Sequence, residues 1–251
     1  MMKNIQSFSV QSEQYARHRP HYPAALFEFL SGVTEHHDCA WDCATGNGQA
    51  ALACATHFAH VEATDVSAEQ IQHCLPHTRI RYSVSPAEQT PFANQAFDLI
   101  MVAQAIHWFD LAQFFNETER VLKPGGVLAA WGYGFLDIER PIDDVISREL
   151  LAPIDPFWAS GNRLVMNGYR DLALPYTAVP IPHEFSMTVA WDLPQLLAYL
   201  RTWSAVKRVT SELGHDPVAR LEPALMALWD HPDTVKTVRM PLYLKVCRKP
   251  G

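Results

Sequence analysis

The sequence predicts a doubly wound α/β fold, with a parallel sheet and helices on both of its faces. Short apolar stretches of strand length, near residues 39–43, 61–65, 79–83 and 97–103, alternate with helical patterns. Such alternation is typical of βαβ units, whose crossovers place consecutive strands in parallel. A glycine turn after the first strand, with an acid closing the second, adds a nucleotide-binding signature.

Each remaining element is indicated by its own periodicity. An apolar stripe that includes Leu26 and Leu30 predicts a first helix over residues 21–31. Lys123 and Pro124 end a later helix, and two glycines make the turn that follows. The same kind of pattern predicts helices near 48–57, 67–73 and 111–122, and a fifth strand near 126–132.

After Gly134 the pattern becomes mainly helical. Residues 141–152 and 193–230 favour helices, 183–190 favours a strand, and strict alternation predicts a final strand at 237–247. We therefore expect a single domain over residues 1–251. Its parts are a nucleotide-binding core at 35–135, a largely helical cap at 140–235 and a final strand at 236–248.

The glycine turn and the following acid outline an adenosine site. Asp42 closes the first strand, Gly46 and Gly48 form the turn, and Asp65 ends the second strand, seventeen residues after Gly48. Glycine lets a backbone approach a ligand closely, and a helix that starts at such a turn presents free N–H groups. An acid at the position of Asp65 can accept hydrogen bonds from two ribose hydroxyls.

The spacing of Asp42, Ala44, Gly46 and Gly48 resembles the first motif of class I S-adenosylmethionine (SAM) dependent methyltransferases. Ala44 departs from the family's usual first glycine, so the turn must tolerate a methyl group there. The dinucleotide fingerprint G-x-G-x-x-G fits less well, because its third glycine is missing.

Further segments resemble the same family in the expected order. These are 85–89 before the strand Phe-Asp-Leu-Ile, Gln-Ala-Ile-His-Trp-Phe at 104–109, and Arg-Val-Leu-Lys-Pro-Gly-Gly at 120–126. The stretches 15–23 and 199–204 resemble a subgroup of methyltransferase type 11 proteins that includes trans-aconitate methyltransferase-like enzymes.

The resemblance implies a fold, a cofactor and a set of cofactor contacts. The fold is a seven-stranded Rossmann-like sheet whose last two strands form an antiparallel edge, here with a helical cap inserted before the last strand. The cofactor is S-adenosyl-L-methionine. Asp65 would hold the ribose, and a solvated loop charge is the alternative for Glu88. The full set of expected cofactor contacts is Asp42, Ala44, Gly46, Gly48, Asp65, Val66, Ala87, Glu88, Gln104, Tyr15 and Arg19.

His107 and Trp108 are the candidate catalytic residues, because they follow the fourth strand at the edge where open α/β sheets bind ligands. His107 is either a general base or a residue that shapes the pocket. Arg201, Trp203 and Tyr22 are candidate substrate contacts. A surface arginine is the alternative for Arg201, and packing within the cap is the alternative for Trp203.

Composition narrows the class of partner. The chain carries 20 basic and 27 acidic residues, a net charge of −7, which argues against a general nucleic-acid binder. The five cysteines show no metal spacing or disulfide framework, and no apolar run is long enough for a membrane span. We expect a cytoplasmic enzyme without a metal, acting on a small-molecule acceptor such as a carboxylate.

Two other functions stay open at this point. A nicotinamide-dependent oxidoreductase would use Asp65 in the same way, but the chain lacks a Tyr-x-x-x-Lys dyad. A non-catalytic SAM-binding protein is the second alternative. Ala44 is the one visible departure from the methyltransferase motif that would favour it. The acceptor atom and the oligomeric state do not follow from the sequence.

Overall fold

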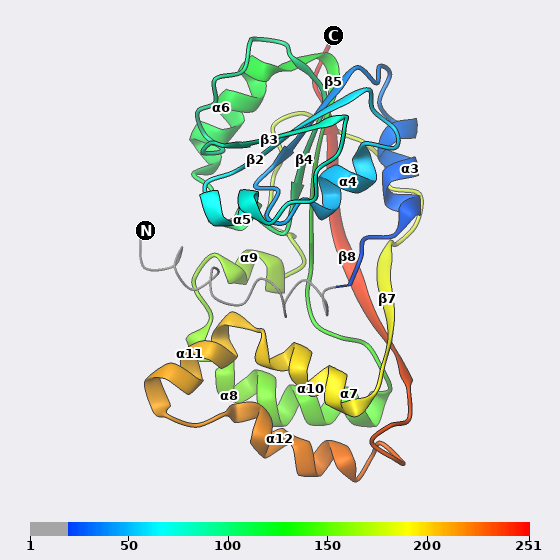
Figure 1. Ribbon diagram of the computed structural model, residues 1–251, viewed down its shortest axis with the longest axis vertical. Coiled ribbons are helices and arrows are strands. Elements are labelled where there is room, and N and C mark those ends of the chain that lie inside the picture. The colour runs from blue at the N-terminus through cyan, green and yellow to red at the C-terminus, as the bar shows by residue number, and fades with distance from the viewer. Residues whose placement is uncertain (1–19) are drawn as a thin grey trace.

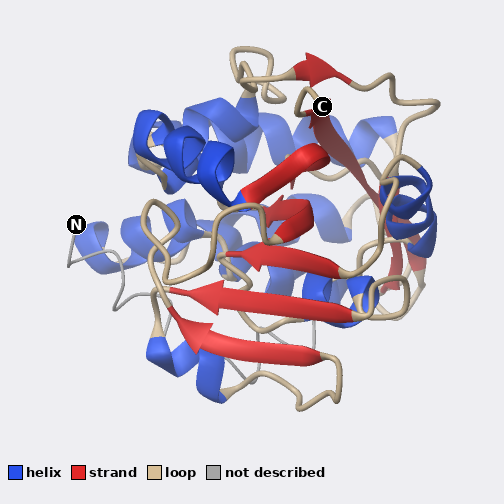
Figure 2. Ribbon diagram, turned by 90° about the horizontal axis from the view of Figure 1, so that it is seen from above, coloured by secondary structure: helices blue, strands red, loops and turns tan. Residues whose placement is uncertain are grey.

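A mixed sheet lies at the centre of the structure, whose computed structural model describes residues 20–251. Within those residues its path of neighbouring strands runs β3-β2-β1-β4-β5-β8-β6, and β7 pairs with β8 (Figures 1 and 2). The strands are β1 (Cys39–Cys43), β2 (His60–Asp65), β3 (Ile80–Val84), β4 (Phe97–Ala103), β5 (Leu122–Tyr133), β6 (Thr177–Ala178), β7 (Ser186–Trp191) and β8 (Lys236–Arg248).

The first five strands are parallel, and the later ones run antiparallel to their neighbours. The short β6 and the longer β7 both pair with β8, so together they flank it as an interrupted edge. The predicted α/β fold with an antiparallel edge is confirmed. The strand order reverses between β1 and β4, and ligands of open α/β sheets bind beyond the carboxyl ends of the strands at such a point.

Helices connect the strands and cover the sheet. Between β5 and β6, and again between β7 and β8, helical segments form a separate layer (Figure 1). The helices are α3 (Ala24–Gly32), α4 (Gln49–Cys54), α5 (Ala68–Gln72), η2 (Ile106–Trp108), α6 (Leu111–Val121), α7 (Arg140–Ile146), η3 (Ser147–Leu151), α8 (Ala152–Ile154), η4 (Asp155–Phe157), α9 (Asn162–Met166), α10 (Leu193–Arg201), α11 (Ser204–Leu213) and α12 (Pro217–Met226).

The central strands are buried on both faces. In β1, Ala40 packs with α3 and α4, whereas Trp41 and Cys43 belong to a second cluster that includes Phe114 of α6. Successive side chains of a strand point to opposite faces, so this alternation follows from the strand geometry. Figure 1 shows α3 and α4 on one side of the sheet and α6 on the other. Buried parallel strands of this kind read as continuous apolar runs.

Strand β8 is longer than the sheet it completes. Residues 242–248 pair with β5, while residues 236–241 pair with β7 beyond the end of β5. The resulting two-stranded ribbon carries the helical layer, which consists of α7, η3, α8, α10, α11 and α12, past the carboxyl ends of the parallel strands (Figure 1).

The helices before the last strand come in two groups, α7–α9 and α10–α12, because β6 and β7 lie between them. Strand β7 matches the strand expected at 183–190. One detail differs from the sequence-based expectation. The helix expected to reach residue 122 ends at Val121, and Leu122 already pairs with Phe97 of β4. No helix within residues 20–251 is both long and apolar enough to cross a membrane.

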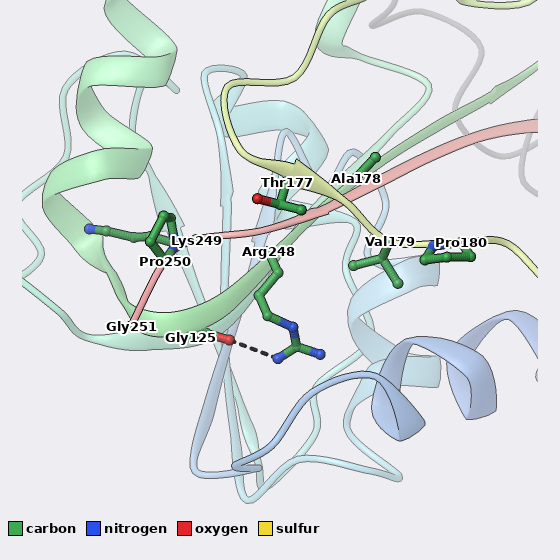
Figure 3. A pocket seen from close by; sticks show the side chains of 9 residues that line it. All are labelled: Gly125, Thr177, Ala178, Val179, Pro180, Arg248, Lys249, Pro250 and Gly251. Carbon is green, nitrogen blue, oxygen red and sulfur yellow. Dashed lines mark hydrogen bonds between the residues drawn. The ribbon is translucent and has the colours of Figure 1, made fainter.

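A surface hollow of about 460 Å³ lies at the amino end of the sheet, opposite the glycine turn. Its walls include Gly125, Thr177 and Arg248 (Figure 3). The Arg248 guanidinium donates to the carbonyls of Gly125 and Val33, so its charge is engaged by backbone oxygens. This hollow is remote from the residues that the sequence predicts for the site.

Asp98 anchors the amino ends of three strands. Its side chain is 2% exposed, and it accepts hydrogen bonds from the backbone N–H groups of Asp38 and Cys39 at 3.0 and 2.9 Å. Its other oxygen accepts from the Lys123 ammonium at 2.7 Å. The neighbouring Asp38 also contacts Lys123, at 3.2 Å, but its side chain is 81% exposed.

We expect Asp98→Ala to lower the free energy of unfolding by about 2–3 kcal/mol, because it leaves the partly exposed Lys123 ammonium and two partly buried backbone N–H groups without their acceptor. Asp38→Ala is the matched control, and it should cost less than about 1 kcal/mol as an exposed ion pair. Chemical denaturation of both variants makes the comparison. Equal losses would show that Asp98 has no special anchoring role.

Candidate active site

The turn after β1 has a left-handed backbone at three alternate positions. Ala44, Gly46 and Gly48 have φ of 57°, 58° and 85°. The turn therefore uses the glycine spacing of the motif, and Ala44 adopts the same conformation at the steric cost that a Cβ brings. A Cβ added at Gly46 would meet nothing within 4 Å. The backbone at Gly46 therefore borders open space.

Gly48 is required for a different reason. It is the residue before α4, and a Cβ added there would come within 2.9 Å of the Tyr82 hydroxyl. The close approach of Tyr82 from β3 therefore leaves no room for a side chain at Gly48. Tyr82 could not be found from the sequence, because no local pattern links it to the turn. Its hydroxyl is buried without a hydrogen-bond partner among the described residues.

Asp42 is completely buried at the end of β1, under the turn. One carboxylate oxygen accepts from the Thr45 hydroxyl at 2.5 Å, and Oδ1 has no hydrogen-bond partner within residues 20–251. Burial raises the pKa of this carboxyl to about 7, against the opposing effect of the Thr45 hydrogen bond. An unpartnered buried acceptor is costly unless something binds to it.

Asp65 holds the turn from the neighbouring strand. Its Oδ2 accepts from the Gly46 N–H at 2.9 Å and its Oδ1 from the Ser67 N–H at 2.8 Å. Each carboxylate oxygen has a second lone pair, so both can still accept from ribose hydroxyls. Burial raises the pKa of Asp65, and these backbone hydrogen bonds act in the opposite direction. Val66, the next residue, is 59% exposed.

The segment after β3 meets the segment after β4. Ala87 is buried, and the Glu88 carboxylate accepts the backbone N–H of Asp110 at 3.1 Å. The structure thus places Ala87 and Glu88 along the same edge as the turn. The hydrogen bond gives Glu88 a structural role that the sequence did not predict.

Gln104 directly follows β4 and has φ of 56°, a conformation that few non-glycine residues adopt. Its side-chain amide donates to the Tyr133 carbonyl at 3.1 Å and accepts the Tyr133 N–H at 3.0 Å. Both amide groups are therefore engaged with β5. Gln104 lies at the expected edge, but its side chain closes the end of the β4–β5 pair.

His107 and Trp108 lie in η2, directly beyond β4. The rings of the two residues are 4.7 Å apart, and Trp108 is 38% exposed. Burial lowers the pKa of His107 to about 4, so its imidazole is neutral at pH 7. Its Nδ1 lies 3.2 Å from the hydroxyl of Tyr169, a buried residue that the sequence analysis did not identify.

The three expected substrate contacts have different surroundings. Tyr22 packs edge-on against Trp131, with ring centroids 5.5 Å apart. Trp203 immediately precedes α11, and its ring lies 6.1 Å from Trp158 and 6.0 Å from Phe135. This half-buried aromatic group of Phe135, Trp158 and Trp203 joins the end of β5 to the helical layer.

Arg201, an expected substrate contact, is engaged in ion pairs within the helical layer. Its Nε donates to the Asp216 carboxylate at 2.7 Å, and its Nη2 lies 3.9 Å from Glu222. Asp216 caps α12, so the guanidinium ties α10 to α12 inside the helical layer. Both of its neighbours are acidic, which favours the alternative of a structural surface arginine over a substrate contact. Tyr15 and Arg19 lie outside the described residues.

The comparisons with known proteins fit this geometry. Residues 41–130 match the family model of a methyltransferase domain. A solved structure from Anaeromyxobacter dehalogenans, described as a type II methyltransferase, is 37% identical, covers 93% of this chain and 99% of its own, and superposes with a TM-score of 0.87. The chain belongs to the class I SAM-dependent methyltransferases.

Two relatives of this methyltransferase differ in how much of the chain they match. A Dictyostelium discoideum protein described as a methyltransferase is 27% identical over 249 residues, covering 96% of this chain and 94% of that protein. The malonyl-[acyl-carrier protein] O-methyltransferase of Dechloromonas aromatica is 34% identical over 124 residues, which is 48% of this chain and 46% of that one. Neither supports the oxidoreductase alternative. The trans-aconitate subgroup stays a prediction.

The cofactor of the methyltransferase is S-adenosyl-L-methionine, and the residues at the turn fit it. Gly46 borders open space, Asp65 can still accept hydrogen bonds, and Oδ1 of Asp42 is a buried acceptor without a partner. Within residues 20–251, no cluster of three or more His, Cys, Asp or Glu side chains could hold a metal ion.

Asp42 makes the stability of the cofactor-free methyltransferase depend on pH. Its folded pKa, about 7, lies above the ordinary value of 3.8, so the unfolded state loses its proton first as pH rises. Stability linked to Asp42 is fully present below pH 4 and is lost as pH rises to about 7. Asp42→Asn should therefore be as stable as wild type near pH 4. It should be more stable at pH 8, by at most about 4 kcal/mol. Denaturation curves that differ by a constant amount at every pH would contradict this.

Asp65→Asn should weaken S-adenosylhomocysteine binding about ten- to hundred-fold, because a charged acceptor is replaced by a neutral amide. Ser67→Ala is the control: it removes the side-chain cap of α5, at a cost of about 1 kcal/mol in stability, without a change in affinity. Calorimetric titration of both variants separates binding from stability. An unchanged Kd in Asp65→Asn would remove Asp65 from the site.

Proposed function

We propose that this methyltransferase transfers the methyl group to a heteroatom of a small-molecule acceptor, which binds between the carboxyl edge of the sheet and the helical layer. The observation that carries the proposal is the position of that layer. It stands beyond the ends of β1, β4 and β5, where the cofactor turn and His107 lie (Figure 1). An acceptor must reach the turn from this side.

The half-buried aromatic group supports an acceptor with an apolar part. Phe135 follows β5, Trp158 follows η4 and Trp203 precedes α11, so three separate segments contribute rings to one junction. Aromatic side chains with a few polar groups are typical of small-molecule sites. We propose Trp203 and Tyr22 as acceptor contacts. Arg201 no longer supports a carboxylate, because its guanidinium is paired with Asp216.

The chemistry that the bound cofactor supplies is an electrophilic methyl group on a sulfonium. In this proposal the chain aligns the acceptor atom with that methyl and keeps water away, which accounts for most of the catalysis in such displacements. Asp65 and the turn hold the adenosine, with Ala87, Glu88 and Val66 beside the adenine. His107 and Trp108 border the methyl, and the indole can favour a cation near its face.

The charge and the cysteines of the chain agree with this proposal. A net charge of −7 disfavours polyanionic acceptors such as tRNA. The five cysteines, Cys39, Cys43, Cys54, Cys74 and Cys247, are free thiols. Free thiols suit a reducing compartment, and we propose the cytoplasm. The Dechloromonas aromatica relative is described as an O-methyltransferase, but it aligns with only about half of this chain. Oxygen, sulfur and nitrogen acceptors therefore all belong in the test.

The test is incorporation of labelled methyl groups from SAM with a panel of small acids, phenols, thiols and amines, alongside tRNA and total protein. We expect label in one class of small molecule. Label confined to the macromolecules would overturn the proposal.

Once the acceptor is identified, Trp203→Ala should raise the KM for that acceptor about ten-fold or more, because the substitution removes a large contact surface. The Kd of S-adenosylhomocysteine should not change. Arg201→Leu is the control from the same layer. It should lower the free energy of unfolding by up to about 1 kcal/mol through the lost ion pairs and leave KM unchanged. Equal KM values in wild type and Trp203→Ala would place the acceptor elsewhere.

A further inference from the structure

Tyr169 joins His107 from a distant part of the sequence. It follows α9, is completely buried, and has φ of 56° in the left-handed region. Its hydroxyl lies 3.2 Å from Nδ1 of His107. A bulky residue in this conformation is an outlier, and strained residues persist where the surrounding structure holds them.

The surroundings of this pair fix its geometry. A Cβ added at Gly132 of β5 would come within 2.9 Å of the Tyr169 hydroxyl and within 2.6 Å of Oε1 of Gln104. A Cβ added at Gly161, before α9, would come within 2.5 Å of the His107 carbonyl oxygen. Two glycines thus let β5 and α9 close upon Tyr169 and His107.

The proton between the two residues can be assigned from hydrogen-bond satisfaction. The Tyr169 hydroxyl is buried, and among the described residues His107 Nδ1 is the hydrogen-bond partner recorded for it. If Nδ1 carried the imidazole proton, the hydroxyl hydrogen would have no acceptor there, which is costly in a buried site. The hydroxyl therefore donates to Nδ1, and the ring proton of the neutral imidazole sits on Nε2.

We propose that Tyr169 is a positioning residue that fixes the Nε2–H tautomer of His107, so that His107 donates a hydrogen bond to the methyl acceptor instead of removing its proton. The proposal rests on the proposed function, because it concerns the acceptor of that same site. It names the acceptor class: its attacking atom carries no proton at neutral pH.

The reaction then balances without a base. A lone pair of the acceptor forms the new bond to the methyl carbon, while the bond from that carbon to the sulfonium breaks and its electron pair stays on sulfur. No proton leaves the acceptor, so none has to be taken up by His107. A neutral donor also avoids a second positive charge next to the sulfonium, which an imidazolium would add.

The titratable groups around His107 agree with a neutral ring. Burial is the sole cause of its lowered pKa, so no charged side chain among the described residues shifts it. Tyr169 faces it from the α9 side, and burial raises the pKa of that phenol, with a smaller contribution from Tyr22. The Tyr169 phenol is therefore protonated at neutral pH, and its hydroxyl can donate.

The direct test is the tautomer itself, read by NMR from two-bond proton–nitrogen correlations in cofactor-free protein labelled with ¹⁵N-histidine. His107→Gln assigns the His107 signals. We expect an unprotonated Nδ1 and a protonated Nε2 at pH 7, and a loss of this preference in Tyr169→Phe. A protonated Nδ1 in wild type, or an unchanged tautomer in Tyr169→Phe, would overturn the proposal. The wild-type spectrum decides even if Tyr169→Phe does not fold.

Kinetics provide the second readout. Tyr169→Phe should raise the acceptor KM about ten-fold and leave the Kd of S-adenosylhomocysteine unchanged. Tyr176→Phe, whose hydroxyl lies 3.4 Å from Thr118, is the matched control without effect on KM. His107→Gln keeps an N–H donor and should retain more activity than His107→Ala. The pH profile of kcat/KM provides a further check. If wild type shows a titration near pH 7 that is absent from His107→Gln, His107 acts as a general base, which would contradict the proposal.

The two proposals fail in distinguishable ways. If no small molecule is methylated, the proposed function fails, yet the NMR measurement still reports the tautomer of His107. If a small molecule is methylated but Nδ1 carries the proton, the proposed function stands and the role of Tyr169 is refuted.

Discussion

The pairing of β8 is the constraint on which the rest of the structure depends. Its residues 242–248 complete the sheet beside β5, and its residues 236–241 hold β7 beyond the sheet. The helical layer hangs on this ribbon, because α10 follows β7 and α12 precedes β8. Without the extra length of β8, the helices would not stand beyond the carboxyl ends of the parallel strands.

Backbone strain gathers at the same edge. Five non-glycine residues within residues 20–251 have positive φ, and three of them lie here: Ala44, Gln104 and Tyr169, which follow β1, β4 and α9 respectively. The other two, Gln95 and Asp230, lie elsewhere. Two of the three are held by a contact from another element: Gln104 by Tyr133, and Tyr169 by His107. Strained residues cluster at functional sites, and here they coincide with a buried carboxylate and a buried neutral imidazole. These features lower the stability of the ligand-free protein, as expected at an edge where a bound ligand offsets that loss.

Local patterns sufficed for the sheet and for the turn. The spacing of Asp42, Gly46, Gly48 and Asp65 predicted which strand ends would meet, because parallel strands place their carboxyl ends at one edge. What the sequence could not show were contacts between distant segments. Tyr169 lies 62 positions from His107, and Tyr82 lies 34 from Gly48, with no periodicity linking either pair. The ion pair of Arg201 could not be predicted for the same reason, since Asp216 caps another helix.

The shared strand also determines how the protein comes apart. Hydrogen bonds of one continuous strand stabilise both the sheet and the helical layer, and buried residues of both belong to one apolar cluster, from Leu26 of α3 to Leu225 of α12. If either part unfolds, the strand hydrogen bonds that β8 makes in the other part become exposed. Local opening of the helical layer is thereby coupled to the stability of the sheet, and the two behave as one cooperative unit instead of as separate foldons.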